Sequence, residues 1–440
     1  MFYVFVAVFI VATTVISLYA AGYKFNLSWP LKFNRLLIKT GMLIVDSNPS
    51  GADIYLNGRQ ETNHSILPWQ KENIITAAKI KNILPGEYDL RLELDGYWPF
   101  EKKIDIYSNQ TTFAEDINLF RSDLPILISS AGNGPLSLSA SKKYLYASGG
   151  QKIIFLKNET ETPVENSASS SAPIDRGQWL TGADSLFLNG QLIAAENGKI
   201  TDYRQVIGTD TDNWHYDEES SRIYYQNKNS LGFFDINSRA SQNILNVNQL
   251  IDYYPAGNSI FLITKQDKQI LLNQYKSAGG TAEQTIILPA VGNYSFAEKK
   301  YNYLEIYDKE SRTLYLANPD KLSSGSKKIS DVISWQWLDE NTIVYNNAWE
   351  IRSFDLKTGN ISLITRVSEE IKQVIWNKSK NYLIFTTDKA LNTLDLGNGT
   401  ITAIFKMEKI LSPILDEKGD SLYFWAKIGQ QEGVYQIMLQ

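Results

Sequence analysis

The side-chain types that perform chemistry are scarce in this chain, and they limit its possible functions. Its 440 residues include two histidines and no cysteine. Disulfides, thiolate metal sites and cysteine nucleophiles are therefore excluded. A Ser-His-Asp arrangement has few options with two histidines, and a three-histidine metal site is impossible within one chain. We expect His64 to be a solvated loop residue in a polar stretch, and His215, which follows Trp214 in an aromatic strand, to be structural.

Carboxylates are abundant, so an acid pair of a hydrolase stays open as an alternative. The segment GTDTDNWHYDE contains Asp210, Asp212 and Asp217, a loose likeness to a calcium loop that lacks the central Gly and the distal Glu. The Asp residues that recur elsewhere are better explained as turn formers. No Gly-x-Gly-x-x-Gly loop and no phosphate-binding loop occurs. We predict no catalytic residue, no metal site and no cofactor, and hence no enzyme.

The composition favours a β-rich protein that does not bind nucleic acid. Hydrophobic residues make up 43% of the chain and aromatic residues 12%, and aromatic side chains suit pleated, half-buried surfaces. The formal net charge is −5 and no long basic run is present. The electrostatic footprint of a nucleic-acid-binding protein is therefore missing.

Residues 1–23 carry no charge and predict a membrane anchor. About 20 apolar residues in a helix span the hydrocarbon core of a bilayer. A cleaved signal peptide is the alternative, with Ala20-Ala21-Gly22 as its cleavage site, but its apolar region is typically shorter and follows a charged start. The anchor would make the membrane one partner of this protein.

The charges around this segment conflict with the expected sidedness. No Lys or Arg precedes it, whereas Lys24, Lys32, Arg35 and Lys39 follow it. Taken literally, the positive-inside rule places the bulk of the chain in the cytoplasm. We nevertheless expect a single-pass protein with its bulk outside the cytoplasm, because a basic stretch upstream of MFYVF would reverse the count. Residues 24–39, which contain Trp29-Pro30, are expected to be a short juxtamembrane linker.

Residues 40–120 show the alternation and the turns of a small β domain. The strand GMLIVDS is followed by Pro49 and Gly51, which predict a hairpin corner, and ADIYLNG then alternates up to an Asn-Gly turn. LPGEY precedes a strand with Tyr88, Leu90 and Leu92 on one face, and TTFAEDINLF supplies a last strand.

These turns resemble the PEGA domain, a small β-sandwich named for a Pro-Glu-Gly-Ala turn. The segments that carry the resemblance are Pro49-Ser50-Gly51-Ala52, Asn57-Gly58, Leu84 to Tyr88, and Gly96-Tyr97. Ser50 replaces the Glu, and residues 59–79 form a longer, more polar connection than the family pattern has. The resemblance implies a bacterial or archaeal, often surface-attached protein and a structural or ligand-presenting module, with no catalytic residue to carry over.

From about residue 130 the chain repeats itself. Eight units each place a strong apolar strand at a spacing of 37 to 43 residues, which is the β-propeller range. The strand centres are Leu145, Phe187, Tyr224, Phe261, Leu304, Val344, Ile384 and Tyr423. The pattern resembles WD-like propeller repeats and predicts seven or eight blades in residues 121–440.

A large residue recurs in the first strand of each unit, and we expect it to pack neighbouring blades together rather than to form a stripe that stacks sugars. These residues are Leu138, Trp179, Trp214, Tyr254, Phe296, Trp337, Trp376 and Leu415. The last unit lacks a fourth strand, so we predict that residues 124–129 pair beside 433–439 and close the ring. The low-complexity residues 159–173 are expected to form a mobile loop.

The sequence thus predicts an all-β protein with an N-terminal transmembrane helix, a small PEGA-like β-sandwich and a β-propeller. The expected function is that of a non-enzymatic, membrane-anchored surface protein that binds protein or cell-envelope polysaccharide through its propeller loops. Two alternatives stay open, a hydrolase with carboxylates in the propeller channel and a cytoplasm-facing scaffold.

Overall fold

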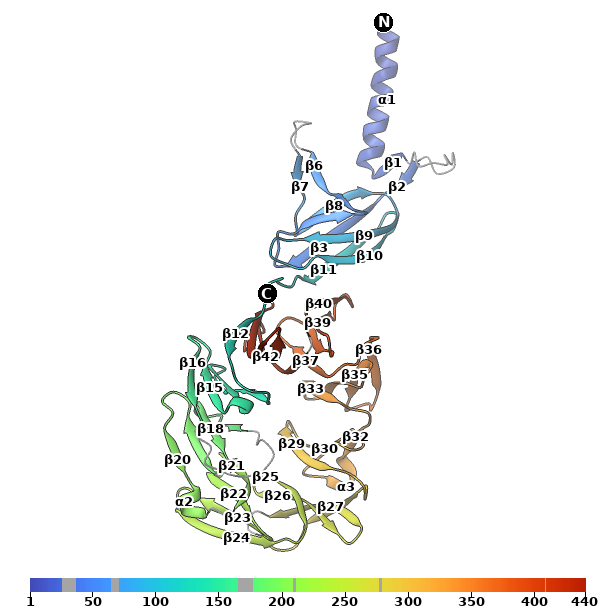
Figure 1. Cartoon of the computed structure of the whole chain (residues 1–440). Helices are drawn as coiled ribbons and strands as arrows, with labels where there is room; N and C mark the ends of the chain where they lie inside the picture. Colours follow the sequence, from blue (N-terminus) through green and yellow to red (C-terminus); the bar gives the residue numbers. More distant parts are fainter. Residues whose placement is uncertain (26–36, 65–70, 165–176, 209–210, 277–278, 408) are drawn as a thin grey trace.

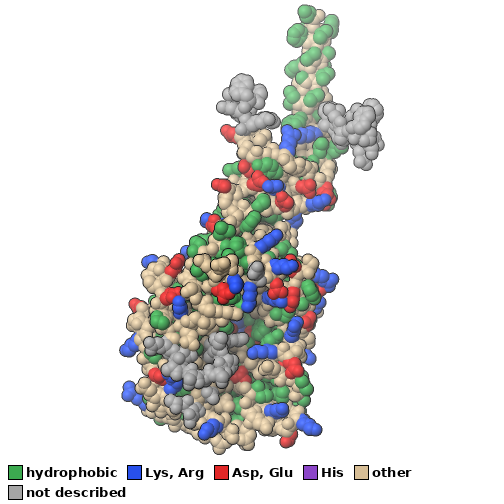
Figure 2. Space-filling model, in the orientation of Figure 1, with side chains coloured by type: hydrophobic (Ala, Val, Ile, Leu, Met, Phe, Trp, Pro, Cys, Tyr) green, Lys and Arg blue, Asp and Glu red, His purple; other side chains and the backbone are tan. Residues whose placement is uncertain are grey.

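A computed structural model describes residues 1–25, 37–64, 71–164, 177–208, 211–276, 279–407 and 409–440. Helix α1 (Phe2–Ala20) stands apart from the rest of the chain, and none of its residues is buried (Figure 1). Figure 2 shows hydrophobic side chains along this helix without a charged one among them. Of the described residues, α1 is the one helix long and apolar enough to cross a membrane.

A short clasp ties the end of α1 to the domain that follows. Strands β1 (Tyr23–Phe25) and β2 (Leu37–Lys39) pair in antiparallel fashion. Beside them Thr40 donates from both its backbone N and its Oγ1 to the carbonyl oxygen of Gly22, at 2.8 and 2.7 Å. Residues 24–39, which were expected to be a linker, thus begin and end in paired strands. Residues 26–36 between them lie outside the description. The clasp therefore holds the C-terminal end of α1 next to the first strand of the small domain.

The small domain is a β-sandwich of two sheets. One sheet has the order β11–β3–β8, with β3 (Gly41–Asn48), β8 (Ala78–Ile83) and β11 (Thr111–Asn118). The other has the order β10–β9–β4–β5, with β4 (Asp53–Leu56), β5 (Arg59–Gln60), β9 (Gly86–Glu93) and β10 (Phe100–Ile106). Alternate residues of the strands, such as Val45, Ile54 and Leu92, fill one core between the sheets.

The Pro49–Ala52 turn is not the hairpin corner that the sequence predicted. Strand β3 pairs with β11 and β8, whereas β4 pairs with β9 and β5, so the turn carries the chain from one sheet to the other. Burial explains why β3 and β4 do not pair. Each strand buries its alternate residues in the same core, so the two strands can face each other across that core. The Asn57-Gly58 turn is a hairpin as predicted, with φ of 50° and 73° at its two residues.

The polar connection after β5 contains a two-stranded ribbon. It consists of β6 (Thr62–His64) and β7 (Lys71–Asn73), which pair in antiparallel fashion. In Figure 1 the ribbon projects from the sandwich on the same side as α1.

The rest of the described chain forms eight four-stranded sheets, here called blades 1 to 8. Blade 1 is β13 (Leu136–Leu138), β14 (Tyr144–Ala147), β15 (Lys152–Phe155) and β16 (Thr160–Pro163). Blade 2 is β17 (Gln178–Trp179), β18 (Ser185–Leu188), β19 (Gln191–Ala194) and β20 (Ile200–Asp202). Blade 3 is β21 (Asp212–Asp217), β22 (Arg222–Asn227), β23 (Ser230–Asp235) and β24 (Ala240–Asn246). Blade 4 is β25 (Leu250–Ala256), β26 (Ser259–Gln266), β27 (Gln269–Lys276) and β28 (Gln284–Leu288).

The second half of the ring repeats this plan. Blade 5 is β29 (Tyr294–Lys300), β30 (Tyr303–Asp308), β31 (Thr313–Ala317) and β32 (Lys327–Ile329). Blade 6 is β33 (Ser334–Asp339), β34 (Thr342–Asn346), β35 (Glu350–Asp355) and β36 (Ile361–Arg366). Blade 7 is β37 (Gln373–Asn377), β38 (Tyr382–Thr386), β39 (Ala390–Asp395) and β40 (Ile401–Lys406). Blade 8 is β41 (Ile410–Leu415), β42 (Ser421–Ile428), β43 (Gln431–Met438) and β12 (Ile126–Ser129). Short helical turns lie at Ser148–Gly150, at α2 (Arg204–Ile207) and at α3 (Leu322–Gly325).

Strand β12 closes the ring as predicted. It pairs in antiparallel fashion with β43, although it precedes β43 by some 300 residues, with Ile126 opposite Gln436 and Leu127 opposite Tyr435. The fourth strand that the last repeat lacks thus comes from the start of the propeller. Of the expected loop at 159–173, residues 160–163 form β16, the outer strand of blade 1, because its ladder with β15 is intact; residues 165–176 lie outside the description.

Apolar clusters lie at all eight seams between neighbouring blades, including the seam between blades 8 and 1. The ring is therefore a continuous packed layer, which Figure 1 shows close to face-on. Each of the eight large first-strand residues belongs to one of these clusters, from Leu138 between blades 8 and 1 to Leu415 between blades 7 and 8. Their predicted packing role is confirmed.

Candidate functional site

A cavity of about 1400 Å³ lies at the centre of the propeller. Its wall is made by the first strands of blades 1, 5, 6, 7 and 8 and by the turns that follow them. First strands surround the axis because each blade starts there and runs outward, so the residues after them gather at one mouth of the cavity. This is where side chains from several blades can meet one ligand.

Many polar side chains of the first strands form hydrogen bonds to the next blade. Gln178 donates from Nε2 to the carbonyl oxygen of Tyr216 at 2.6 Å and accepts the backbone N–H of the same residue at 3.0 Å. Gln336 accepts the N–H of Trp376 in the same way, at 2.5 Å. Each of these bonds spans about one repeat and joins two first strands that no ladder connects. These polar side chains therefore link the first strands of neighbouring blades, which together form the inner ring of the propeller.

Two carboxyl groups of the inner ring have raised pKa values, and both are acceptors between blades. Burial raises the pKa of Glu305, whose oxygens accept the indole N–H groups of Trp335, at 3.0 Å, and of Trp337. Burial likewise raises the pKa of Asp252, which accepts the N–H of Tyr253 at 2.8 Å and that of Phe296 at 2.7 Å. Burial is the main cause of both raised pKa values, and the accepted hydrogen bonds act in the opposite direction because they favour the charged carboxylate.

The two histidines singled out in the sequence lie in different domains, His64 in the ribbon of the sandwich and His215 in blade 3. His215 lies half-buried in the first strand of blade 3 with its ring 5.1 Å from that of Tyr254, and burial lowers the pKa of His215 to about 4. His64 pairs with Lys71 at the end of the β6–β7 ribbon. Asp217 accepts a bond from Ser220 Oγ at 2.6 Å as a turn former. Asp210 and the side chains of Asp212 and His64 lie outside the description. Among described residues no group of three metal-ligating side chains occurs.

The Asp residues that end the third strands are turn formers, as the sequence indicated. Asp235, Asp355 and Asp395 each accept backbone N–H groups two or three residues further on.

Charged side chains stand at the mouth of the cavity without ion pairs. They come from the turns after the first strands of blades 1, 7 and 8 and from the end of β29, the first strand of blade 5: Lys142, Glu298, Lys300, Lys378, Asp416 and Glu417. None of the six forms a salt bridge with another residue of the described chain. The mouth therefore carries three cationic and three anionic side chains that form no salt bridge with the described residues.

A joint that the sequence reasoning missed connects this propeller to the sandwich. The consecutive residues Leu119 and Phe120 are both buried, Leu119 in the sandwich core and Phe120 in the seam between blades 7 and 8. The ring of Phe120 meets that of Tyr382 edge-on at 4.9 Å. Because adjacent side chains are anchored in two different cores, little bending is possible between the domains. Two large apolar residues in succession at the end of an alternating strand were the available signal.

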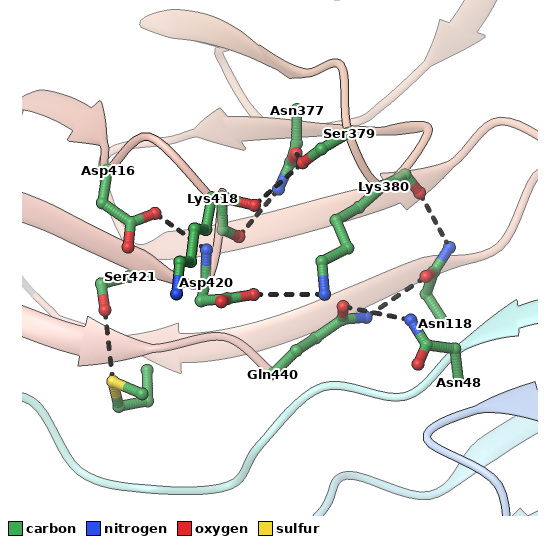
Figure 3. A network of polar contacts seen from close by, with 12 residues as sticks. Asn48, Asn118, Asn377, Ser379, Lys380, Asp416, Lys418, Asp420, Ser421 and Gln440 are labelled. Carbon is green, nitrogen blue, oxygen red and sulfur yellow. Dashed lines mark hydrogen bonds and ion pairs between the residues drawn. The ribbon is translucent and has the colours of Figure 1, made fainter.

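Polar contacts extend the joint to the mouth of the cavity (Figure 3). Asn118 of β11 donates from Nδ2 to the carbonyl oxygen of Lys380 at 3.3 Å, and the amide of Gln440 donates to Asn118 Oδ1 at 3.2 Å. Lys380 forms an ion pair with Asp420 at 3.1 Å, and the N–H of Asp420 binds the carboxylate of Asp416 at 2.9 Å. The sandwich thus contacts the turns that frame the cavity.

Comparisons with known proteins give no family. No protein-family model and no curated protein sequence matches the chain. The chain resembles several solved structures at low identity. A eukaryotic initiation factor has 14% identity, with 70% of this chain and 86% of that chain covered and a TM-score of 0.45. A chain of a mitotic checkpoint complex has 10% identity, with 72% and 93% covered and a TM-score of 0.38. Hsv2 of Kluyveromyces lactis has 10% identity, with 49% and 71% covered and a TM-score of 0.34.

Proposed function

We propose that this protein is a non-enzymatic, membrane-anchored interaction protein whose propeller binds a protein partner at the mouth of its central cavity. Helix α1 is the anchor, the sandwich is a spacer, and the joint at Leu119 and Phe120 holds the propeller in a fixed orientation. The observation that carries the proposal is a difference between the polar side chains within the inner ring and the charged side chains at the mouth. Polar groups deep in the ring bond to neighbouring blades, whereas the charges at the mouth have no ionic partner.

A photo-crosslinking amino acid at the mouth tests this proposal in the native membrane. We expect a discrete, protease-sensitive adduct from position Lys142 or Lys378 at the mouth and none from Asn237 or Lys357, which are exposed in turns at the outer rim. Adducts of equal yield at all four positions, or none at the mouth, would contradict a binding role of the mouth. An adduct that glycosidases remove but proteases leave intact would point instead to a polysaccharide.

We further propose that the propeller lies outside the cytoplasm and that the sandwich is a PEGA-type module. The turn positions that carry the resemblance have the backbone angles that glycine permits, with φ of 100° at Gly51 and 78° at Gly96. Protease added to intact cells tests the sidedness. Cleavage of the propeller without lysis is the expected result, and protection until lysis would support a cytoplasm-facing scaffold.

A further inference from the structure

The clasp and the turn of residues 107–110, together called the membrane end of the sandwich, expose aromatic and basic side chains beside α1. Tyr107 follows β10 directly and is 56% exposed, and Tyr19 in the last turn of α1 is 54% exposed. Lys24 of the clasp is exposed as well. Figure 2 shows basic side chains at the foot of α1. Exposed tyrosines next to a helix that can span a membrane are typical of the bilayer interface.

Hydrogen bonds join the membrane end directly to the helix. The carbonyl oxygen of Gly22, just after α1, accepts both bonds of Thr40. The turn after β10 is bonded to the same strands, because Ser108 Oγ donates to the carbonyl oxygen of Lys39 at 2.9 Å. The N–H of Asn109 donates to the carbonyl oxygen of Thr40, also at 2.9 Å. The depth at which α1 ends in a bilayer therefore sets the depth of this turn.

The length of α1 places the membrane end among the lipid headgroups. Its 19 residues, at about 1.5 Å each, span about 28 Å, which is about the thickness of the hydrocarbon core. The headgroup layer adds about 5–8 Å on each side. Tyr107 falls at this level, because its carbonyl oxygen approaches the start of β3 so closely that a Cβ at Gly41 would lie 2.4 Å from it.

Two lysines of the clasp give the membrane end a positive charge. Lys24 on β1 and Lys39 on β2 form no salt bridge within the described part of the chain. The ammonium group of Lys39 lies 5.9 Å from the centre of the Tyr23 ring, a contact that leaves its charge uncompensated. Anionic phospholipids supply the net negative charge that both lysines lack, whereas zwitterionic lipids do not.

The nearest carboxylates of the sandwich belong to the other sheet. Glu87 of β9 and Asp105 of β10 stand opposite each other, and Glu87 pairs with Lys103 at 2.9 Å. The clasp leads into β3, which is part of the sheet β11–β3–β8. The charge next to α1 is therefore that of the lysines.

We propose that the membrane end of the sandwich docks on the headgroups of anionic phospholipids, with Tyr107 in the interface and Lys24 and Lys39 bound to lipid phosphates. The sandwich then stands on the bilayer surface, so the fixed orientation of the propeller begins at the membrane. This inference rests on the anchoring role of α1 in the proposed function and is independent of what the propeller binds.

The depth of a spin label in nanodiscs tests the docking, and the chain has no cysteine of its own. Labelled cysteines replace Gln110, exposed in the docked turn, or Asp95, exposed in the turn at the other end of β9, in the full chain. The label at Gln110 should be shielded from a water-soluble nickel reagent, and the label at Asp95 should meet it freely. Equal access at both positions in a chain retained by nanodiscs would overturn the docking alone. A chain that nanodiscs do not retain would contradict the anchor, and the docking with it.

Spin-labelled lipids test the role of charge. In phosphatidylcholine nanodiscs, labelled phosphatidylglycerol should associate with the chain about fivefold or more strongly than labelled phosphatidylcholine, which is the effect of about one lysine at the headgroups. Added salt should weaken this preference, and Lys24→Glu with Lys39→Glu should abolish it. Lys268→Glu with Lys357→Glu, in exposed turns of blades 4 and 6, changes the net charge equally and should leave the preference intact. Equal association of the two lipids, or a preference that survives the change of both clasp lysines, would overturn the proposed lipid class.

Discussion

Replacing Phe120 by Ala should destabilise the propeller although Phe120 precedes its first strand. The side chain is 2% exposed and sits in the seam between blades 7 and 8, edge-on to Tyr382. Removing a buried Phe side chain costs about 3–5 kcal/mol, which includes the cavity left behind and the lost aromatic contact. We expect a loss of this size in the free energy of unfolding of the propeller.

Hydrogen exchange of the full chain in nanodiscs measures this loss for each domain separately. Amides of β38 and β42 should lose protection equivalent to about 3–5 kcal/mol, while amides of β9 in the sandwich keep theirs. Leu119→Ala is the mirror control, because Leu119 is 1% exposed in the sandwich core. It should weaken β9 by about 2–5 kcal/mol and leave β38 unchanged. A loss below about 1 kcal/mol in β38 on Phe120→Ala would refute the anchoring of this residue in the seam.

Three further predictions concern single side chains. The pKa of His215 is about 4 in the folded protein and about 6.5 in the unfolded chain. The free energy of unfolding should therefore be unaffected by this histidine above about pH 6.5 and should fall by up to about 3 kcal/mol as the pH drops towards 4. Denaturant titrations should show a weaker pH dependence of the free energy of unfolding in His215→Phe. Thr386→Val removes a buried hydroxyl that has no partner among described residues and should leave stability equal or raise it by up to about 1 kcal/mol, whereas Thr264→Val deprives Asn273 of its acceptor and should cost about 1–2 kcal/mol in thermal unfolding. Gly419→Ala should cost about 2 kcal/mol or more, since φ is 74° and the new Cβ would lie 2.4 Å from the side chain of Asn377; equal stability in the same assay would show that this turn adapts.

The repeats made the propeller predictable from the sequence. Each unit places a large residue in its first strand and an apolar run in its second, and a period near 40 residues leaves few other folds. The closing strand followed from the missing fourth strand of the last unit, since an open ring would expose edges. The pairing of β12 with β43 confirms this prediction, although the two strands lie some 300 residues apart in the sequence.

The turn at Pro49 and the joint could not be derived in the same way. A turn residue fixes local angles, but it does not decide whether the strands on either side pair or face each other across a core. The joint depends on Phe120 meeting blades 7 and 8, whose residues lie more than 250 positions away in the sequence. The sequence also could not show that the buried Nε1 atom of Trp376 has no partner among the described residues, because the position of Trp376 in the repeat is that of a packing residue.

We propose that the propeller is a recognition module held rigidly at the membrane, and a distance measurement tests this rigidity most directly. The chain has no cysteine, so spin labels can be placed at two introduced cysteines alone. Glu115 on the sandwich and Lys357 on blade 6 are both exposed and suitable. In nanodiscs, double electron–electron resonance should give one narrow distance distribution that broadens with Phe120→Ala. A broad or multiple distribution in the otherwise unchanged chain would contradict the rigid joint and the account built on it.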